Sequence, residues 1–467
     1  MILENTKRGK HCYNQNEDRL SDLPDGVLLH ILSFLNTKRV VQTCILSKRW
    51  KHLWKRSSTL MLHSTKFSTV KRFATFVSKV LTLRDTSTAL NALDLYRHGD
   101  IEPQLLKKIL NYVCSHNTHI QELGISVNGD SGLIMSCVSS CHALTSLKLS
   151  IYPRGSIGSH TPTLFPKSLN LPSLISLNLT NFAFCGGESD CVEPFFAFTK
   201  LSCLVICGCK VKDAQILSIS SETLVNLAIE DPLEKINLAK QTDFFEEAIQ
   251  TDYSSNFAEI KLSTPNLYTF SFTGDLIQKI CRSGLSSVKQ VNIDDSRQDD
   301  ASVEHGLVLF SWLLDFANVE SLTVTSTTLQ ILSLVPDLLE VKLPSLCNLK
   351  SLEVELTPLD EGYLSQTIKD AMLKKAAAKS DKEFLKLIKA FKARLELPPI
   401  PDGIVDFLRQ NSLSAQVTFT TEFPHRFNLM EDDKSSNEDK VEKHQPNSTS
   451  PLFVTTGSEE FSIWLTY

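Results

Sequence analysis

The feature that most constrains this 467-residue chain is a recurring group of three apolar residues at relative positions 0, +3 and +5. Most successive groups start about 20 to 30 residues apart, a spacing typical of stacked repeats. One unit cannot bury its own leucines, so the pattern predicts a stack whose Leu-x-Leu strands form a parallel sheet on a concave face. The ten groups begin at Leu90, Ile120, Leu144, Leu174, Leu201, Leu224, Leu267, Val288, Val319 and Leu349.

The residues that alternate with these leucines point to the opposite face of each strand. They are a mixed polar set suited to recognition, exemplified by Lys148, Asn178, Asn226, Thr269 and Glu353. The longest interval leaves extra chain at 231–261, which is acidic and aromatic. We expect a long loop or an extra helix there, either as a plain insertion or as a substrate contact.

Residues 18–66 have the pattern of three short amphipathic helices. Ser21 or Asp22 can cap the first, Thr37 the second over Lys38–Leu46, and Ser47 the third. Apolar side chains recur at helical spacing at Leu28, Ile31, Leu32, Leu35, Val40, Val41, Cys44, Ile45, Trp50, Leu53 and Trp54. A block this short cannot bury all these faces alone, so it packs on the rest of the chain or docks on a partner.

The block resembles an F-box. The matching features are the Leu23-Pro24 pair, Ile31-Leu32, Leu46-Ser-Lys-Arg-Trp50 and a second tryptophan, Trp54. This resemblance implies docking on a Skp-type adaptor, which joins cullin and RING subunits into a ubiquitin ligase. The implied adaptor-facing residues are Leu20, Leu23, Pro24, Leu28, Ile31, Leu32, Leu35, Leu46, Trp50 and Trp54. Some of them must instead hold the three helices together, and the sequence does not separate the two groups.

The repeats resemble the leucine-rich array of plant F-box proteins, with a C-terminal segment similar to FBD-type members. Cys209 stands where such a repeat expects a buried Asn or Cys. The resemblance implies an α/β fold, with an N-terminal F-box and a curved leucine-rich-repeat solenoid. It implies a non-catalytic, substrate-recognition subunit that binds an unknown target. The alternatives are a small-molecule-sensing receptor with the same array and a non-ligase interaction scaffold.

Composition and these resemblances together divide the chain into five regions: a flexible tail at 1–17, the block resembling an F-box at 18–66, the array at 67–356, a C-terminal segment at 357–424 and a mostly disordered polar tail at 425–467. The C-terminal segment contains a basic amphipathic pattern at 368–395. Phe384 and Ile388 would pack this helix on the array. A helix of this kind can also bind calmodulin or a membrane surface.

Composition argues against several other functions. The net charge is −5, which disfavours nucleic acid, so we interpret Lys48, Arg49, Lys51, Lys55 and Arg56 as a solvated rim of a partner interface. No apolar run is long enough to span a bilayer and no secretory signal is present, so we expect a soluble protein of the cytoplasm or nucleus with 12 reduced cysteines. The pattern around Cys114, His116, His119, Cys137, Cys141 and His142 lacks the paired spacing of a zinc site. We expect no metal, cofactor or catalytic centre.

Overall fold

The computed structural model describes residues 20, 23–155, 161–186, 190–230, 259–274, 279–281, 285–295, 303–356, 373–374, 377, 380–392 and 400–420. The predicted tails at 1–17 and 425–467 lie outside these residues, as does most of the insertion predicted at 231–261.

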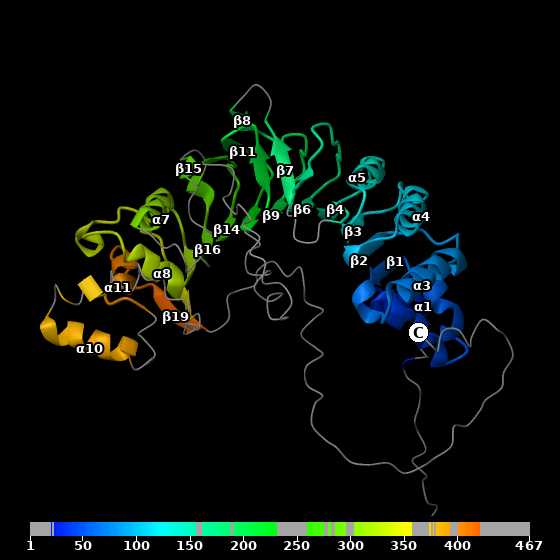
Figure 1. Cartoon of the computed structure of the whole chain (residues 1–467), viewed down its shortest axis with the longest axis horizontal. Coiled ribbons are helices and arrows are strands. Elements are labelled where there is room, and N and C mark those ends of the chain that lie inside the picture. Colours follow the sequence, from blue (N-terminus) through cyan, green and yellow to red (C-terminus); the bar gives the residue numbers. More distant parts are fainter. Residues whose placement is uncertain are drawn as a thin grey trace, which may run out of the picture.

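One parallel sheet of 12 strands runs through the described residues and curves into an arc (Figure 1). It lines the inner side of the arc, as the repeat pattern predicts. In spatial order its strands are β1 (Thr59–His63), β2 (Ala92–Asp100), β3 (Glu122–Asn128), β4 (Ser146–Tyr152), β6 (Ser176–Thr180), β9 (Cys203–Cys207), β12 (Asn226–Glu230), β14 (Thr269–Thr273), β16 (Gln290–Asp294), β17 (Ser321–Thr325), β18 (Ser351–Glu355) and β19 (Gln416–Thr420).

All ten predicted groups supply strands of this sheet. The register pairs equivalent residues of neighbouring repeats, so Leu93 lies beside Leu123 and Leu123 beside Leu147. These side chains are buried in a continuous core on the outer side of the sheet. Stacking therefore buries the leucines that a single repeat would leave exposed.

The sheet also crosses both predicted ends of the array, because β1 lies before residue 67 and β19 lies after residue 356. The three-residue pattern misses these two strands because Ser57 and Ser414 occupy the leading position in place of an apolar residue. A terminal strand has a neighbour on one side only. The requirement for a leading leucine is correspondingly weaker there.

Helices and two small parallel sheets form the outer layer (Figure 1). The helices are α3 (Val70–Leu83), α4 (Pro103–Cys114), α5 (Ser131–Ser139), α7 (Val303–Asp315), α8 (Ser326–Leu332) and α11 (Ile404–Leu408), and the 3-10 turns are η3 (Ser64–Lys66), η4 (Leu285–Ser287) and η5 (Leu338–Glu340). The small sheets are β10 (Lys210–Lys212), β7 (Phe182–Cys185) and β5 (Thr163–Leu164), and β15 (Lys279–Cys281), β13 (Glu259–Ser263), β11 (Ile216–Ser220) and β8 (Cys191–Val192). Between successive strands of the main sheet, the chain thus returns through short strands in the middle repeats and through helices in the outer repeats.

The region that resembles an F-box differs in detail from its predicted helices. Its helical part comprises α1 (Asp25–Ser33), α2 (Thr37–Gln42) and two 3-10 segments, η1 (Thr43–Ile45) and η2 (Trp50–Arg56), and strand β1 and turn η3 complete the predicted 18–66 region. The second helix is therefore shorter than predicted, and Asn36 rather than Thr37 caps it by accepting from the Arg39 N–H at 3.0 Å. The Thr37 hydroxyl instead accepts from the Met61 N–H of β1 at 2.9 Å.

In the C-terminal segment, the predicted helix at 368–395 is described as a helix only over α10 (Asp381–Lys392), apart from isolated helical residues at 373, 374 and 377. Phe384 and Ile388 are half-buried on it, whereas Leu385 is exposed.

Gly306 marks a close approach between α7 and α8. A Cβ atom there would lie 2.8 Å from the carbonyl oxygen of Ile331 and 3.0 Å from Val335 Cγ2. We expect Gly306→Ala to lower the free energy of unfolding by about 1–3 kcal/mol, because the helices must separate. Gly26→Ala is the matched control, since a Cβ in that helix meets nothing within 4 Å. Urea unfolding of both variants measures the difference; equal stability would contradict the tight contact.

Candidate docking surfaces

The helical block at the N-terminus has a small apolar core of its own. Leu28 and Leu32 lie on the inner face of α1, and Trp50, Leu53 and Trp54 approach from η2. All five side chains are at most 6% exposed. Continuity of this core with the array means that the block packs on the rest of the chain.

The structure separates the ten predicted adaptor-facing residues into three groups. Leu28, Leu32, Trp50 and Trp54 are buried, so their side chains belong to the core and present no surface to a partner. Leu23, Ile31 and Leu35 are half-buried. The exposed members are Leu20, Pro24 and Leu46.

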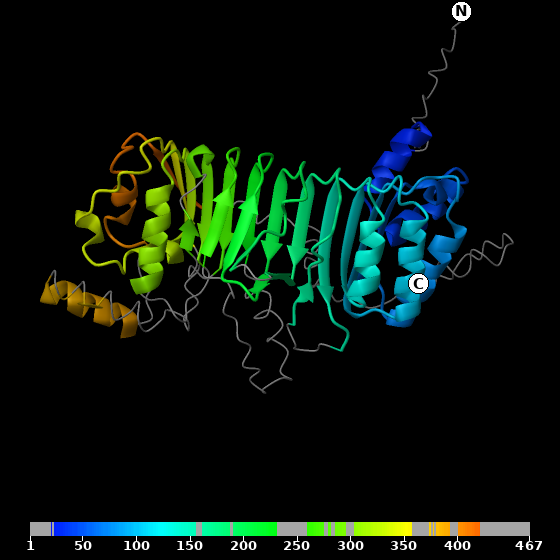
Figure 2. The ribbon, with the colours of Figure 1, turned by 90° about the horizontal axis from the view of Figure 1, so that it is seen from above.

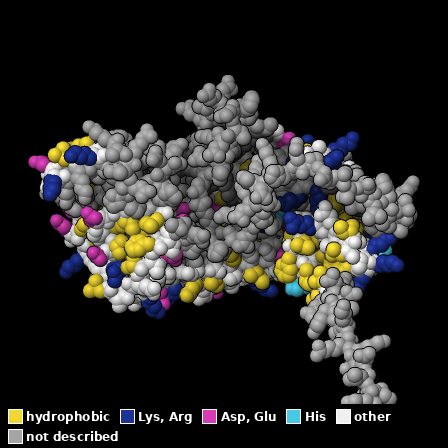
Figure 3. Space-filling model, turned by 90° about the horizontal axis from the view of Figure 1, so that it is seen from below, with side chains coloured by type: hydrophobic (Ala, Val, Ile, Leu, Met, Phe, Trp, Pro, Cys, Tyr) yellow, Lys and Arg dark blue, Asp and Glu magenta, His cyan; other side chains and the backbone are white. Residues whose placement is uncertain are grey.

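Three further apolar side chains that the motif does not single out are exposed on the same block. Val27 lies on α1, Phe34 directly follows it and Ile45 lies on η1. Val27 and Phe34 are seven residues apart, which places them on one side of the helix, and this spacing was visible in the sequence. Figure 3 shows hydrophobic side chains gathered over the end of the molecule that carries this block, and Figure 2 shows the dark-blue helix α1 projecting beyond the sheet.

Exposed apolar side chains at this density are unusual for a surface that meets only water. We call Leu20, Val27, Phe34, Ile45 and Leu46 the exposed F-box face. Phe34 is 69% exposed, and its ring meets that of His30 edge-on at 4.9 Å between centroids.

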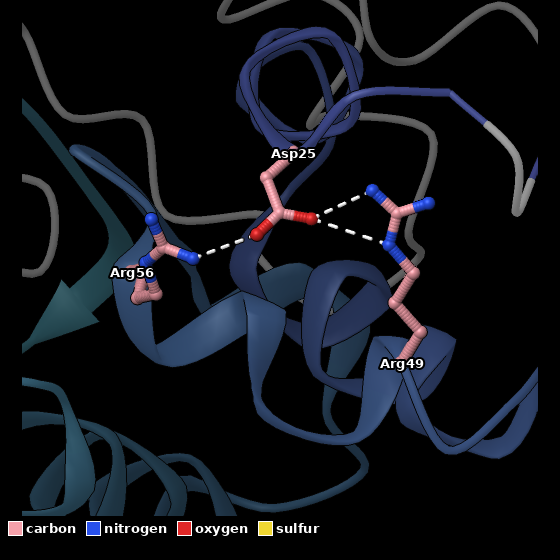
Figure 4. Close-up of polar contacts among 3 residues, drawn as sticks. All are labelled: Asp25, Arg49 and Arg56. Atoms are coloured by element: carbon pink, nitrogen blue, oxygen red, sulfur yellow. Dashed lines mark hydrogen bonds and ion pairs between the residues drawn. The ribbon is translucent and has the colours of Figure 1, made fainter.

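Two of the basic residues predicted to form a solvated rim are held within the block. Arg49 donates through Nη2 and Nε to Asp25 Oδ1 at 2.7 and 3.2 Å, and Arg56 donates to Oδ2 at 2.8 Å (Figure 4). Hydrogen bonds from Arg49 and then from Arg56 lower the pKa of Asp25. This contact fixes the start of α1 against η2, a role that the charge pattern alone did not reveal.

The block is joined to the first strands by polar contacts as well as by its core. Thr37 accepts from β1, and the Lys38 ammonium donates to the Lys66 carbonyl at 2.6 Å and lies 4.6 Å from the centre of the Phe67 ring. Beside them, the buried Arg84 guanidinium donates to the carbonyl of Ser57, which directly follows η2. The block and the array therefore share one rigid junction.

The concave face of the sheet is polar at its ends and apolar at its centre. Lys148 lies beside Asn178 in the register, as expected for this face, and Asn178 lies beside Val205. Val205 and its next neighbour Ala228 are both buried. The predicted mixed polar surface is thus interrupted by a small apolar centre. Asn178 is buried as well, and among the described residues its Oδ1 has no hydrogen-bond partner.

Nearer the block, the concave face carries a hydrogen-bonded pair. His63 Nε2 of β1 lies 2.8 Å from Asp94 Oδ2 of β2. Gly124, the next residue in the register, leaves space that Asp94 occupies, because a Cβ there would lie too close to Asp94 Oδ1. The Asp94 carboxylate is thus positioned by its contact with His63 and by the space that the missing side chain of Gly124 leaves.

The cysteine and histidine residues weighed as zinc ligands form no metal site within the described part of the chain. Cys137 and Cys141 are buried, and their thiols contact the backbone carbonyls of Leu110 and Cys137 at 3.6 and 3.3 Å. Cys209 is also buried, as the repeat pattern predicts, and burial raises the pKa of its thiol to about 12. No helix among the described residues has the length and apolar character to cross a membrane.

Comparison with known proteins gives the block its family. The F-box domain family matches residues 20–60. The chain contains an F-box domain. That match spans the core, the exposed F-box face and the first residues of β1.

Relatives of this F-box chain extend over most of its length. A putative FBD-associated F-box protein of Arabidopsis thaliana is 26% identical over 374 residues, which cover 76% of this chain and 73% of the relative. F-box/LRR-repeat protein 13 of the same plant is 25% identical over 339 residues, covering 70% and 69%. The chain is thus similar to plant proteins that combine an F-box with leucine-rich repeats or with an FBD segment.

One solved structure, the crystal structure of a TLR13–ssRNA13 complex, matches 64% of this chain and 46% of its own. Its TM-score is 0.25 and its identity 10%, so this match supports no conclusion about the fold or function of the chain.

Proposed function

We propose that this chain is a substrate-recognition subunit of a cullin-RING ubiquitin ligase. The exposed F-box face binds a Skp-type adaptor, which links the chain to cullin and RING subunits, and the concave face of the repeats binds a target protein. The observation that carries the proposal is that the F-box has a buried apolar core and, in addition, five large apolar side chains that are exposed. A partner that covers this face would remove the apolar surface from water.

On this proposal the chain performs no chemistry of its own. The ligase gains its rate because the bound target is held close to the ubiquitin-carrying enzyme, which raises the effective concentration of target lysines. The rigid junction at Thr37 and Arg84 supports such a role, because it holds the target-binding face at a set position relative to the adaptor. The site of action proposed is the cytoplasm or nucleus, where thiols such as Cys137 stay reduced.

Adaptor binding by Phe34→Asp and Ile45→Asp variants tests the proposal. We expect each to weaken binding at least about tenfold, since burial of a large apolar side chain contributes about 1.5–3 kcal/mol and the new carboxylate opposes desolvation. Phe196→Asp is the matched control, because Phe196 is 72% exposed but lies in the repeats. The measurement is the dissociation constant of the purified full chain for a Skp-type adaptor.

Thermal unfolding of the same variants shows whether they remain folded. We expect unchanged midpoints, because a substitution at an exposed position leaves the fold intact. Unchanged adaptor affinity in both Phe34→Asp and Ile45→Asp would refute docking through this face. An equal loss in Phe196→Asp would show that the effect does not come from the F-box.

A further inference from the structure

A groove at the C-terminal end of the array is separate from both proposed docking surfaces. Its volume is about 770 Å³. It lies along the edge of the sheet where the strands begin, since Lys289, Glu320 and Lys350 directly precede β16, β17 and β18. One wall of the groove is the segment 410–414, which leads into β19, the strand next to β18.

The three charged residues form a regular row along the groove. The Glu320 N–H donates to the Lys289 carbonyl and the Lys350 N–H to the Glu320 carbonyl, both at 2.8 Å. These bonds continue the strand ladder, so neighbouring residues of the row are about 4.8 Å apart. The two lysines are therefore about 10 Å apart, with the carboxylate between them.

Glu320 shares its carboxylate between two ammonium groups. Lys289 Nζ lies 3.3 Å from Oε1, and Lys350 Nζ lies 2.5 Å from Oε2. Hydrogen bonds from Lys350 and then from Lys289 lower the pKa of Glu320, so it stays ionised near neutral pH. The row carries one net positive charge.

The ion pair between Lys350 and Glu320 is weak. The Lys350 side chain is 74% exposed, and an exposed ion pair contributes little to stability because water screens it. Lys350 can exchange Glu320 for a carboxylate of a ligand at small cost. Lys289 is more enclosed and supplies a fixed positive charge at the other position.

The wall formed by 410–414 is held in place before any ligand arrives. The Asn411 amide donates to the Ser345 carbonyl at 3.0 Å, and the Ser412 hydroxyl donates to the Leu346 carbonyl at 2.8 Å. Gln410 accepts from the Leu343 N–H at 3.3 Å. A preformed wall lowers the ordering cost of binding.

Apolar side chains lie at both ends of the charged row. Leu413, on the wall, is 77% exposed. Tyr268, just outside the lining of the groove, is also exposed, and its carbonyl accepts from the Lys289 N–H at 3.0 Å, which makes it the next residue of the row. From Tyr268 to the last strand is four strand steps, or about 19 Å, the length of about six extended residues.

We propose that this groove binds an extended acidic segment of a partner protein, with two acidic residues three positions apart and an apolar residue at each end. The acids meet Lys289 and Lys350, and the apolar residues contact Tyr268 and Leu413. Nucleic acid fits less well, because Glu320 in the middle of the row would repel successive phosphates. The proposal does not depend on the F-box or on the ligase assignment.

The test uses the purified full chain and a fluorescein-labelled peptide, Leu-Asp-Ser-Ser-Glu-Leu. Fluorescence anisotropy measures its dissociation constant. We expect Lys350→Gln to weaken binding about fivefold or more through loss of a charged contact. We expect Glu320→Gln to tighten binding about threefold, because it removes both the repulsion and the competition for the lysines. A residue with only a structural role would not give this increase.

Lys200→Gln is the control for general charge, since Lys200 is exposed in the repeats away from the groove. It should leave affinity unchanged, as should Phe34→Asp, which separates this site from the F-box. No measurable binding of the peptide, weaker binding in Glu320→Gln, or an equal loss in Lys200→Gln would each overturn the proposal. Stronger binding of a short single-stranded oligonucleotide than of the peptide would also overturn it.

Discussion

Replacing Arg84 with alanine is expected to lower the free energy of unfolding by about 3–5 kcal/mol, because a buried charged hydrogen-bond network loses its centre. Arg84 is 3% exposed. Its guanidinium donates to the carbonyls of Ser57, Thr88 and Ala89 at 2.8 to 3.0 Å and to the Tyr112 hydroxyl at 2.7 Å. In the variant the Ser57 carbonyl would be left buried without this donor, and the part-buried acceptors of Thr88, Ala89 and Tyr112 would lose theirs.

Arg84→Lys should recover only part of this stability, since a single ammonium cannot reach all the acceptors that the planar guanidinium joins. Arg39→Ala, at an exposed site on α2, is the control and should change stability by less than about 0.5 kcal/mol. Urea unfolding followed by circular dichroism measures all three. A loss below 1 kcal/mol in Arg84→Ala would show that water replaces the guanidinium without cost.

The junction also makes a functional prediction from the same variant. Ser57 directly follows η2 of the F-box, and Arg84 directly follows α3 of the array. A looser junction should leave the exposed F-box face intact. The target, however, would be held less firmly in one position relative to the adaptor. Under the proposed function, ubiquitin transfer to a bound target should therefore fall more than adaptor affinity does.

The sheet could be predicted because each stacked repeat carries apolar residues at equivalent positions. Leu93, Leu123 and Leu147 have the same role in successive strands, so a pattern of three positions found ten strands of the main sheet. The pattern says little about the return segments. There Phe165, Phe184 and Phe195 form an aromatic cluster with centroids 5.3 to 6.3 Å apart beside the short strands of a second sheet. Packing of that kind has no fixed spacing along the chain.

The candidate site could be located from sequence but not resolved into its parts. Core residues and docking residues of a three-helix block are both apolar and both recur at helical spacing, so Leu28 and Leu46 look alike in the sequence. In the structure Leu28 is buried and Leu46 exposed. The difference depends on how α1, η1 and η2 pack together, and only the folded arrangement supplies it. The same applies to the groove at Lys350, whose members lie tens of residues apart.

Trp50 gives the sharpest test of this distinction. It is 2% exposed in the core of the F-box, so we expect Trp50→Ala to lower the free energy of unfolding of that region by about 3–5 kcal/mol through the cavity left behind. Trp50→Phe fills more of the space and should cost less. Limited proteolysis followed by mass spectrometry locates the loosened region within the chain.

Adaptor binding should decline in Trp50→Ala only as the F-box unfolds, and lowering the temperature or adding a stabilising osmolyte should restore it. Phe34→Ala should behave in the opposite way, with normal stability and weaker adaptor binding under all conditions. A Trp50→Ala protein that keeps normal stability yet fails to bind the adaptor would contradict this division. It would mean that the F-box opens on binding and that the tryptophan itself contacts the partner.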